Sequence, residues 1–485
     1  AEAINELNDS DLKYSKQWFI EYLQYLKTFV ESVDSNKFET IRFRKIEKLD
    51  GNGFYKLSSA SAYIPENIDE SQNRNIKVVF KDNRKDNIDL TFVSKKNQDL
   101  IIKTPRLYSD SDLVKIFQLE LLYIPNIDLL SRLEFAFRSL DEWEDYKISF
   151  PAVNYIYGPP GTGKTTEIQR KIQEIISDNA DAKILILTPT NKACDVIGDR
   201  LLKEKFESFY RLAGKTSDDI PDEFYKNDIE LGDLIEVNVI ISTIHRFPYY
   251  NWVPNSEENS LRGMKDFWDY LIIDEASMIT APYITFACMN VVQKNKNVKI
   301  IIAGDPKQIP PIPELNDADL ELIKVKTENI YSMFNLSSFI EDEQNQIKRP
   351  IDVIKNLPIQ YRSVPEIGNL FSGFSYDNRV KSKRSKSSLM KIPKTIGKLF
   401  TQPVNFVSVP LTSEDTLYSH NKLMYSSYHI YTTILVTEIL KYLEDFVEDE
   451  KWTVGIISPY KAQAILINKL IGDFGFKDNI KITAD

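Results

Sequence analysis

The chain has 485 residues, which exceeds what one hydrophobic core supports and predicts about three domains. Its 61 basic and 71 acidic residues give a net charge of −10, which argues against wholesale wrapping of nucleic acid but not against a local basic channel. Because the sequence has an ordinary 42% of apolar residues, no run of about eighteen of them and no apolar leader segment, we expect a soluble intracellular protein, cytoplasmic or nuclear, with no membrane partner.

The N-terminal region is predicted to be an accessory domain rather than an independent enzyme, because it contains no catalytic constellation. Apolar residues between Trp18 and Val30 recur at helical spacing, and short alternating apolar runs separated by turn residues follow them. From Leu113 to Trp143 the apolar spacing becomes helical again. The expected parts are a stalk helix at residues 1–35, a small β-barrel or sheet at 36–105 and stalk helices at 106–150.

A glycine-rich phosphate-binding motif follows this region. Its residues fit the pattern G-x-x-x-x-G-K-[ST] at every position and are Gly158, Pro159, Pro160, Gly161, Thr162, Gly163, Lys164 and Thr165, with Thr166 next. The glycines permit backbone angles that turn consecutive N–H groups toward phosphate oxygens at a helix N-terminus. Lys164 supplies a charge for the β- and γ-phosphates, and the Thr165 hydroxyl is available to Mg²⁺. The sequence therefore predicts a site for a nucleoside triphosphate.

Four further apolar runs alternate with helical patterns and predict a parallel sheet that binds its ligands at the carboxyl ends of the strands. The runs are residues 184–187, 239–241, 270–273 and 299–302. Asp274 and Glu275 follow the third run, where the aspartate can hold a Mg²⁺ shell and the glutamate can polarise an attacking water. Gln308 follows the fourth run and suits the sensing of a γ-phosphate or water, although a loop that merely ends the strand is an equal interpretation.

Small polar residues follow the first two of these runs. They are Pro189, Thr190 and Asn191 after the first run, and Ser242 and Thr243 after the second. Hydroxyl and amide groups beside exposed N–H groups typically contact a phosphate backbone without reading bases. Helix capping explains the same residues and is compatible with that role. We interpret His245 nearby as a structural hydrogen-bonding residue rather than an acid–base catalyst.

Taken together, the motifs resemble those of superfamily 1B helicases, in particular the up-frameshift, senataxin and Dna2 group. Besides the phosphate loop, the matching motifs are Thr-Pro-Thr-Asn at 188–191, Asp-Glu-Ala-Ser at 274–277, Gly-Asp-Pro-Lys-Gln-Ile-Pro-Pro at 304–311, Leu-Pro-Ile-Gln-Tyr-Arg-Ser at 357–363 and Gly-Ile-Ile-Ser-Pro-Tyr-Lys-Ala-Gln at 455–463. The resemblance implies an α/β fold with two RecA-like parallel-sheet domains, at residues 151–325 and 326–485, and with ATP bound between them. It also implies a single strand of RNA or DNA across both domains and an accessory barrel that grips nucleic acid.

The resemblance also implies roles for single residues. Lys164 and Thr165 match ligands of phosphate and Mg²⁺, Asp274 the acid of the Mg²⁺ shell, and Glu275 the catalytic base. Gln308 matches the motif that couples γ-phosphate to strand binding, and Arg362 an arginine that reaches from the second domain to the transition state. Tyr361 would stack near the adenine, with a core aromatic as the equal alternative. The implied strand contacts are Pro189, Thr190, Asn191, Ser242, Thr243, Pro459 and Tyr460.

The sequence departs from the family pattern in three places. The helical insertion that some relatives carry in the first RecA-like domain is at most short here, around residues 205–234. The family usually carries a glutamine that reads adenine before the phosphate loop, whereas Ser139, Leu140 and Asp141 stand in that region here. The chain ends at Asp485, where the last two motifs of the family would begin, and its first residue is not Met. We therefore expect a fragment whose second RecA-like domain is truncated at its C-terminal end.

The resemblance implies an ATP-dependent translocase or helicase that moves 5′ to 3′ on single-stranded RNA or DNA, uses ATP and Mg²⁺, and works as a monomer. The alternative is a nucleotide-switched clamp or protein scaffold that does not unwind. A ring-forming AAA+ ATPase shares the phosphate loop but does not predict Gln360, Tyr361 and Arg362 in a second domain of the same chain.

Overall fold

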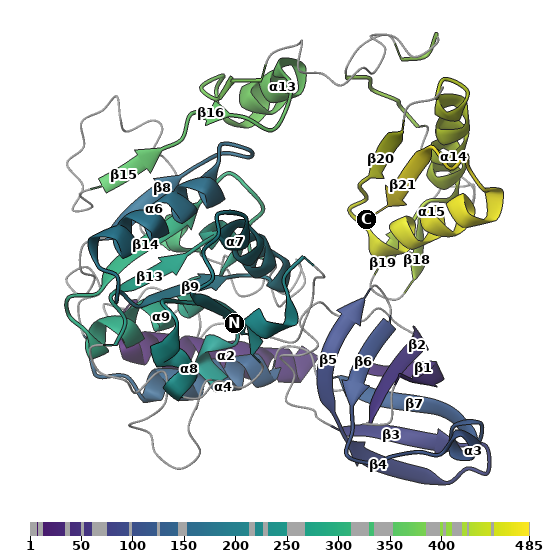
Figure 1. The fold of residues 1–485 in the computed structure, drawn as a ribbon, viewed down its shortest axis with the longest axis horizontal. Coiled ribbons are helices and arrows are strands. Elements are labelled where there is room, and N and C mark those ends of the chain that lie inside the picture. Colours follow the sequence, from purple (N-terminus) through teal and green to yellow (C-terminus); the bar gives the residue numbers. More distant parts are fainter. Residues whose placement is uncertain are drawn as a thin grey trace. The chain divides into compact units, whose positions relative to one another are not determined.

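The computed structural model describes two compact units, Ala1–Arg362 and Ser363–Asp485 (Figure 1), and each is treated by itself. The described residues are 7, 13–33, 39–49, 53–60, 75–96, 99–123, 127–143, 153–212, 219–226, 231–249, 267–311, 329–333, 353–384, 398–400, 404–409, 420–423, 426–447 and 451–484. Among these residues, no helix combines the length and the apolar character needed to cross a bilayer.

An eight-stranded sheet forms the centre of the first unit, with the strand order β11-β10-β12-β9-β13-β14-β8-β15. Every neighbouring pair is parallel, which confirms the sheet type predicted from the fully apolar runs. The strands are β8 (Val153–Tyr157), β9 (Ile184–Thr188), β10 (Phe209–Leu212), β11 (Tyr225–Lys226), β12 (Val239–Thr243), β13 (Tyr270–Ile273), β14 (Lys299–Gly304) and β15 (Val353–Asn356). Strand β15 falls in the range predicted for the second domain, yet it pairs with β8.

Helices cover both faces of this sheet, as predicted. Alternate residues of β9 point to opposite sides, so Ile184 and Ile186 share a buried core with α6 and α7, while Leu185 and Leu187 share one with α9, α2 and α4. The helices are α2 (Lys16–Val33), α4 (Ile127–Arg138), α6 (Lys164–Asp178), α7 (Asn191–Lys203), α8 (Leu231–Glu236) and α9 (Ala281–Lys294). The predicted N-terminal helix is therefore confirmed, and it packs against α4 and the core around α9.

A seven-stranded antiparallel sheet with its own core precedes the parallel sheet in the sequence, in the order β4-β3-β7-β1-β2-β6-β5. Its strands are β1 (Glu39–Lys48), β2 (Phe54–Ala60), β3 (Asn75–Phe80), β4 (Lys85–Asp89), β5 (Thr91–Lys96), β6 (Asp99–Lys103) and β7 (Ile116–Tyr123). Among the described strands β4 and β5 end the order, so the structure has the predicted sheet without a pairing that closes it into a barrel.

The helical prediction from Leu113 onward is wrong for its first part. Only the short α3 (Asp110–Leu113) precedes β7, which lies between β3 and β1. The buried Leu119 and Leu121 alternate with the partly exposed Glu120, which is the two-residue period of a strand. The apolar residues of the whole region were numerous enough to suit a helix, but pairing with two neighbouring strands decided the conformation.

The second unit contains shorter pieces of sheet. Strands β20 (Trp452–Ile456) and β21 (Ile480–Ala484) pair in parallel, and α15 (Lys461–Phe474) connects them. Its other described elements are α13 (Pro365–Ser375), β17 (Lys381–Ser382), β18 (Asn421–Leu423), β19 (Ser426–Tyr428) and α14 (Ile430–Glu444). A parallel pair joined by a helix is the repeating unit of the predicted α/β architecture.

Candidate nucleotide and nucleic-acid sites

The phosphate loop connects β8 to α6 and contains two left-handed glycines. Gly161 has φ +74° and Gly163, the residue before α6, has φ +91°, angles that strongly disfavour other residues. The first residue of the motif, Gly158, must be a glycine for a different reason. A Cβ on Gly158 would lie 2.6 Å from Cγ of Lys164 and 2.7 Å from Oγ1 of Thr162, so close packing requires glycine there. The loop therefore presents main-chain N–H groups at the N-terminus of α6.

The lysine of the loop points back over it. Lys164 is 7% exposed, and its Nζ donates a hydrogen bond to the Gly158 carbonyl at 2.9 Å. The same Nζ lies 3.7 Å from Oε1 of Glu275. The positive charge is thus held between the loop and the predicted catalytic base, in a partly desolvated place where electrostatic interactions are strong.

The predicted acid pair lies at the carboxyl end of β13. Asp274 is 3% exposed, and burial, helped by the charge of Glu275, raises the pKa of its carboxyl group to about 7. The Glu275 N–H donates to Oδ1 of Asp274 at 2.8 Å. Within the described structure Oε2 of Glu275 is buried and accepts no hydrogen bond. Two such carboxylates suit a cation or a polarised water, because either would relieve their desolvation and mutual repulsion.

The backbone at Glu275 is strained. Its φ and ψ are 50° and 40°, in the left-handed region that costs a non-glycine residue roughly 1–2 kcal/mol. The adjacent strand end packs tightly against this turn, since a Cβ on Gly304 would lie 3.1 Å from the Ala276 nitrogen. Strain that the surroundings maintain is typical of functional sites, and it agrees with the role predicted for Glu275.

Gln308 lies in the loop after β14 and contacts a buried acid. Its Nε2 donates to Oδ2 of Asp305 at 2.9 Å, and Asp305 is fully buried. The end of β14 also touches the phosphate loop, where the Gly158 N–H donates to the Gly304 carbonyl at 3.2 Å. Strand β14 therefore leads into the loop of Gln308 and is bonded to the phosphate loop at its end. The contact of Gln308 with a γ-phosphate stays a prediction.

Arg362 and Tyr361 lie beside the phosphate loop. The Tyr361 N–H donates to the Gly161 carbonyl at 2.9 Å. A Cβ on Gly161 would lie 2.6 Å from Cβ of Arg362, so the arginine passes directly over this glycine. Both side chains are exposed, and Arg362 is the last residue of the first unit. The proximity of Arg362 to the phosphate loop agrees with its predicted role. The prediction assigned Arg362 to the second domain, whereas the structure places it in the first compact unit.

The predicted strand contacts of the first unit differ in exposure. Thr190 is exposed and caps α7, since its side chain accepts from the Ala193 N–H at 3.2 Å, which confirms the capping interpretation for this residue. Pro189 and Asn191 are half-buried. Ser242 and Thr243 are 0% and 1% exposed, so a strand contact there would need the main chain or a movement of the loop.

The remaining two predicted strand contacts belong to the second unit. Tyr460 precedes α15 and is 51% exposed, and Pro459 is exposed beside it. Exposed aromatic rings of this kind can stack on bases. The segment that stands where the family has its adenine-reading glutamine is attached to α9, because the main chain of Asp141 exchanges two hydrogen bonds with the amide of Gln293.

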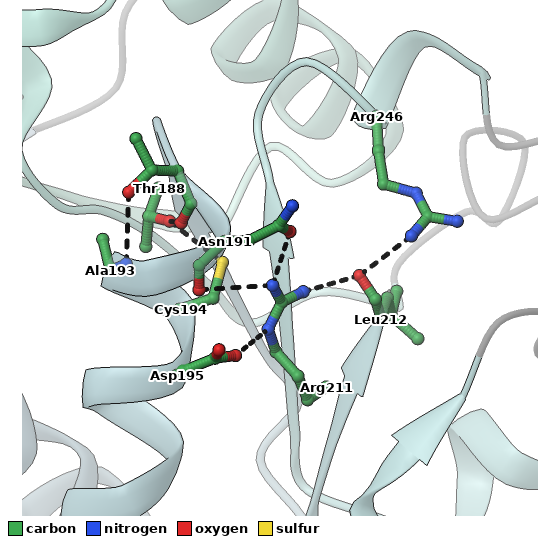
Figure 2. A network of polar contacts seen from close by, with 9 residues as sticks. Thr188, Asn191, Ala193, Cys194, Asp195, Arg211, Leu212 and Arg246 are labelled. Atoms are coloured by element: carbon green, nitrogen blue, oxygen red, sulfur yellow. Dashed lines mark hydrogen bonds and ion pairs between the residues drawn. The ribbon is translucent and has the colours of Figure 1, made fainter. Parts of the chain in front are cut away.

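Two residues near the site were not predicted from the sequence. Tyr331, in α11 (Ile330–Met333), has a buried hydroxyl without a hydrogen-bond partner among the described residues, and a Cβ on Gly304 would lie 2.5 Å from that oxygen. Nothing in its surrounding sequence indicated this position. Arg211 is fully buried beside Asn191 (Figure 2), and the signal available for it was a charged residue within the apolar strand of Phe209 and Leu212.

Comparison with known proteins shows similarity to two AAA-domain families and to several helicases. Residues 148–314 match one family model described as an AAA domain, and residues 337–484 match a second model with the same description. The DNA polymerase alpha-associated DNA helicase A of Saccharomyces cerevisiae is 25% identical over 72% of this chain and 58% of its own length.

Two further relatives have similar identities. The putative helicase mov-10-B.2 of Danio rerio is 26% identical over 69% of this chain and 33% of its own length. The DNA replication ATP-dependent helicase/nuclease dna2 of Schizosaccharomyces pombe is 24% identical over 66% of this chain and 22% of its own length. The chain thus spans between about a fifth and three fifths of the length of these three relatives.

Proposed function

Because the chain belongs to the superfamily 1 helicases of the up-frameshift and Dna2-like group, we propose that it is an ATP-dependent 5′-to-3′ translocase or helicase acting on single-stranded RNA or DNA. The observation that carries the proposal is the 3.7 Å approach of Lys164 to Glu275. It joins a phosphate-binding loop and a candidate base, which lie 111 positions apart in the sequence, into one site.

The chain's own residues would divide the work of ATP hydrolysis. The N–H groups of the loop and Lys164 would bind and orient the phosphates, and Glu275 would hold the attacking water and accept its proton. Arg362 would stabilise the charge that develops on the phosphoryl oxygens, a contribution worth about 10³ to 10⁵ in rate for arginines in this position. Tyr361 would lie against the adenine.

The site suits a Mg²⁺ ion as well as a triphosphate. Asp274 has a carboxyl pKa raised by burial, and Glu275 has a buried carboxylate oxygen without a partner in the described structure, so a cation would compensate both. Thr165 and Asp274 would hold the ion. When bound, the ion would neutralise charge on the phosphates and orient them.

The strand would lie over the carboxyl ends of β9 and β12 in the first unit, at Pro189, Thr190, Asn191, Ser242 and Thr243, with Pro459 and Tyr460 as contacts of the second unit. Loop N–H groups and small side chains suit sequence-independent binding of a phosphate backbone. The antiparallel N-terminal sheet would be the accessory nucleic-acid grip. We propose a monomeric motor in which Gln308 couples the state of the nucleotide to strand contact.

The test is ATP turnover with and without a single-stranded oligonucleotide. Glu275→Gln should keep nucleotide binding and lower strand-stimulated turnover at least about 100-fold, because the amide cannot accept the proton. Glu223→Gln, an exposed residue on the same unit, serves as the matched control and should behave as wild type. Wild-type turnover in Glu275→Gln would remove Glu275 from its role. ATP-dependent strand binding without displacement of a duplex would favour the nucleotide-switched clamp instead.

A further inference from the structure

A fully buried arginine lies beside the proposed strand contacts, and the hydrolysis of ATP does not use it. Arg211 is the third residue of β10, at the point where the parallel sheet meets the N-terminus of α7. An arginine side chain is hardly ever buried completely unless an opposite charge and several hydrogen-bond acceptors compensate for the lost water. The acceptors around Arg211 therefore indicate what its guanidinium group fixes in place.

The guanidinium group holds both the main chain and the side chain of Asn191. Its Nη2 donates to the Asn191 side-chain oxygen at 2.6 Å and to the Asn191 carbonyl at 3.4 Å. Its Nε donates to Oδ1 of Asp195, one turn further along α7, at 3.0 Å. Three contacts from one planar group thus define the position of the first turn of this helix.

The contact also fixes which way the amide of Asn191 faces. A guanidinium group offers only donors, so the amide oxygen of Asn191 must face Arg211. Figure 2 shows the amide nitrogen on the side turned away from Arg211, and within the described structure it makes no hydrogen bond. Asn191 is half-buried and follows the exposed cap residue Thr190, so its two N–H donors lie where the strand phosphates are proposed to pass.

The same arginine links the first turn of α7 to the end of its own strand, β10. Its Nη1 donates to the Leu212 carbonyl at 2.6 Å, and Nη1 of Arg246 donates to that carbonyl at 3.3 Å. Arg246 belongs to the loop that follows Ser242 and Thr243, and the Ile244 N–H in that loop donates to the Thr188 carbonyl at 2.9 Å. These contacts therefore join the carboxyl ends of β9, β10 and β12, and Figure 2 shows those that Arg211 and Arg246 make with Leu212.

We propose that Arg211 is a positioning residue for nucleic-acid binding: it orients the amide of Asn191 so that its N–H donors face the phosphate backbone. The inference rests on the proposed strand-binding function, because Arg211 itself is buried and touches no strand. It adds a dependence that the strand contacts alone do not contain. The affinity for a strand should change with a residue that cannot reach it.

The experiment is a double-mutant cycle with the full chain and a fluorescent single-stranded oligonucleotide, in which the Kd is measured by anisotropy. Asn191→Ala should raise the Kd about tenfold, the effect of one or two lost hydrogen bonds to a charged group. Arg211→Lys should raise it by a similar factor, because an ammonium group can pair with Asp195 but cannot also hold the oxygen of Asn191 in the same fork. The double variant should bind within about twofold of Asn191→Ala, since both changes remove one interaction.

Two further variants separate positioning from stability. Asn191→Asp keeps an oxygen acceptor facing Arg211, so the thermal midpoint should stay near that of wild type while strand binding is lost through the missing donors and the added negative charge. Lys16→Met removes a buried lysine that donates to the Leu140 carbonyl at 2.6 Å, and it should lower the thermal midpoint without changing the Kd.

The outcomes distinguish the positioning role of Arg211 from the proposed strand-binding function. Wild-type affinity in Arg211→Lys, multiplicative effects of the two changes, or an equal rise of the Kd in Lys16→Met would overturn the positioning role and leave the proposed function intact. A wild-type protein that binds no strand would contradict the proposed function and this inference together.

Discussion

Lys164, in the first turn of α6, lies 3.7 Å from Glu275, which directly follows Asp274 at the carboxyl end of β13. The lysine also donates to the Gly158 carbonyl, so the pair connects the phosphate loop with the acidic strand end. Both residues are held by their surroundings, Lys164 through burial and Glu275 through a strained backbone. The fold thus fixes the charged groups of the candidate nucleotide site, which is the arrangement expected of a preorganised catalyst.

Gly161→Ala should abolish nucleotide binding. A methyl group there would lie 2.6 Å from Cβ of Arg362, and the left-handed backbone at φ +74° costs alanine about 1 kcal/mol or more before that clash is counted. The measurement is the affinity for a fluorescent ATP analogue together with the thermal midpoint. Gly232→Ala is the control, because an added Cβ would have open space in α8 and alanine favours a helix; it should be neutral or stabilising. Normal nucleotide affinity in Gly161→Ala would mean that the loop rearranges freely.

Arg362→Ala should lower strand-stimulated ATP turnover by about 10³ or more while changing strand affinity little, because the arginine lies over the phosphate loop. Turnover and the oligonucleotide Kd are measured on the same preparation. Lys383→Ala, which removes an exposed cation of the second unit, should leave turnover unchanged. If Arg362→Ala hydrolyses ATP at the wild-type rate, Arg362 has no part in the transition state.

Tyr331→Phe should raise the free energy of unfolding by about 1 kcal/mol. The change removes a buried hydroxyl that has no hydrogen-bond partner among the described residues, and such a group costs stability in the folded protein. Thermal or urea unfolding measures the effect. Tyr210→Phe is the contrasting variant, because its hydroxyl donates to Glu236 at 2.9 Å and its loss should be neutral or destabilising. A clear destabilisation by Tyr331→Phe would show that the hydroxyl has a partner in solution.

His245→Gln should make the protein less sensitive to acid. Burial lowers the pKa of the imidazole from 6.5 to about 4, and a hydrogen bond with the main chain of Pro189 opposes this only in part. The unfolded chain therefore takes up a proton at a higher pH than the folded chain, so the contribution of neutral His245 is present above about pH 6.5 and is lost as the pH falls toward 4.

The size of this effect is reduced by partial exposure. The imidazole ring is surrounded by protein atoms, yet His245 as a whole is only partly covered. We therefore expect the contribution of His245 to the free energy of unfolding to fall by about 1–2 kcal/mol between pH 7.5 and pH 4.5. The measurement compares the thermal midpoints of wild type and variant across that range, and the difference should shift in favour of His245→Gln as the pH falls. A constant difference would show that His245 does not couple protonation to folding.

The sequence predicted the central sheet well because parallel strands buried on both faces are continuous apolar runs. It predicted the phosphate loop for a different reason, since Gly161 and Gly163 need backbone angles that few other residues adopt. Strand β7 was mistaken for a helix because it was grouped with the helical apolar spacing further along the same region. Leu119 and Leu121 are buried two residues apart, which is the spacing of a strand, and pairing with β3 and β1 agrees with it.

The parts of the site that depend on tertiary contacts were beyond a reading of the sequence. Burial of Ser242 and Thr243 follows from their place at the end of a central strand, and the link between Arg211 and Asn191 joins positions 20 residues apart through a helix and a sheet. The lone arginine in the apolar strand β10 was a signal, but its partner could be identified only from the fold.

We propose that ATP hydrolysis moves the protein 5′ to 3′ along a strand. The most direct measurement is displacement of a labelled strand from two duplexes, one with a 5′ single-stranded overhang and one with a 3′ overhang, by wild type and by Glu275→Gln. We predict ATP-dependent displacement of the 5′-overhang duplex by wild type, little displacement of the 3′-overhang duplex, and none by the variant. Displacement without ATP, equal displacement by the variant, or a preference for the 3′ overhang would contradict the account.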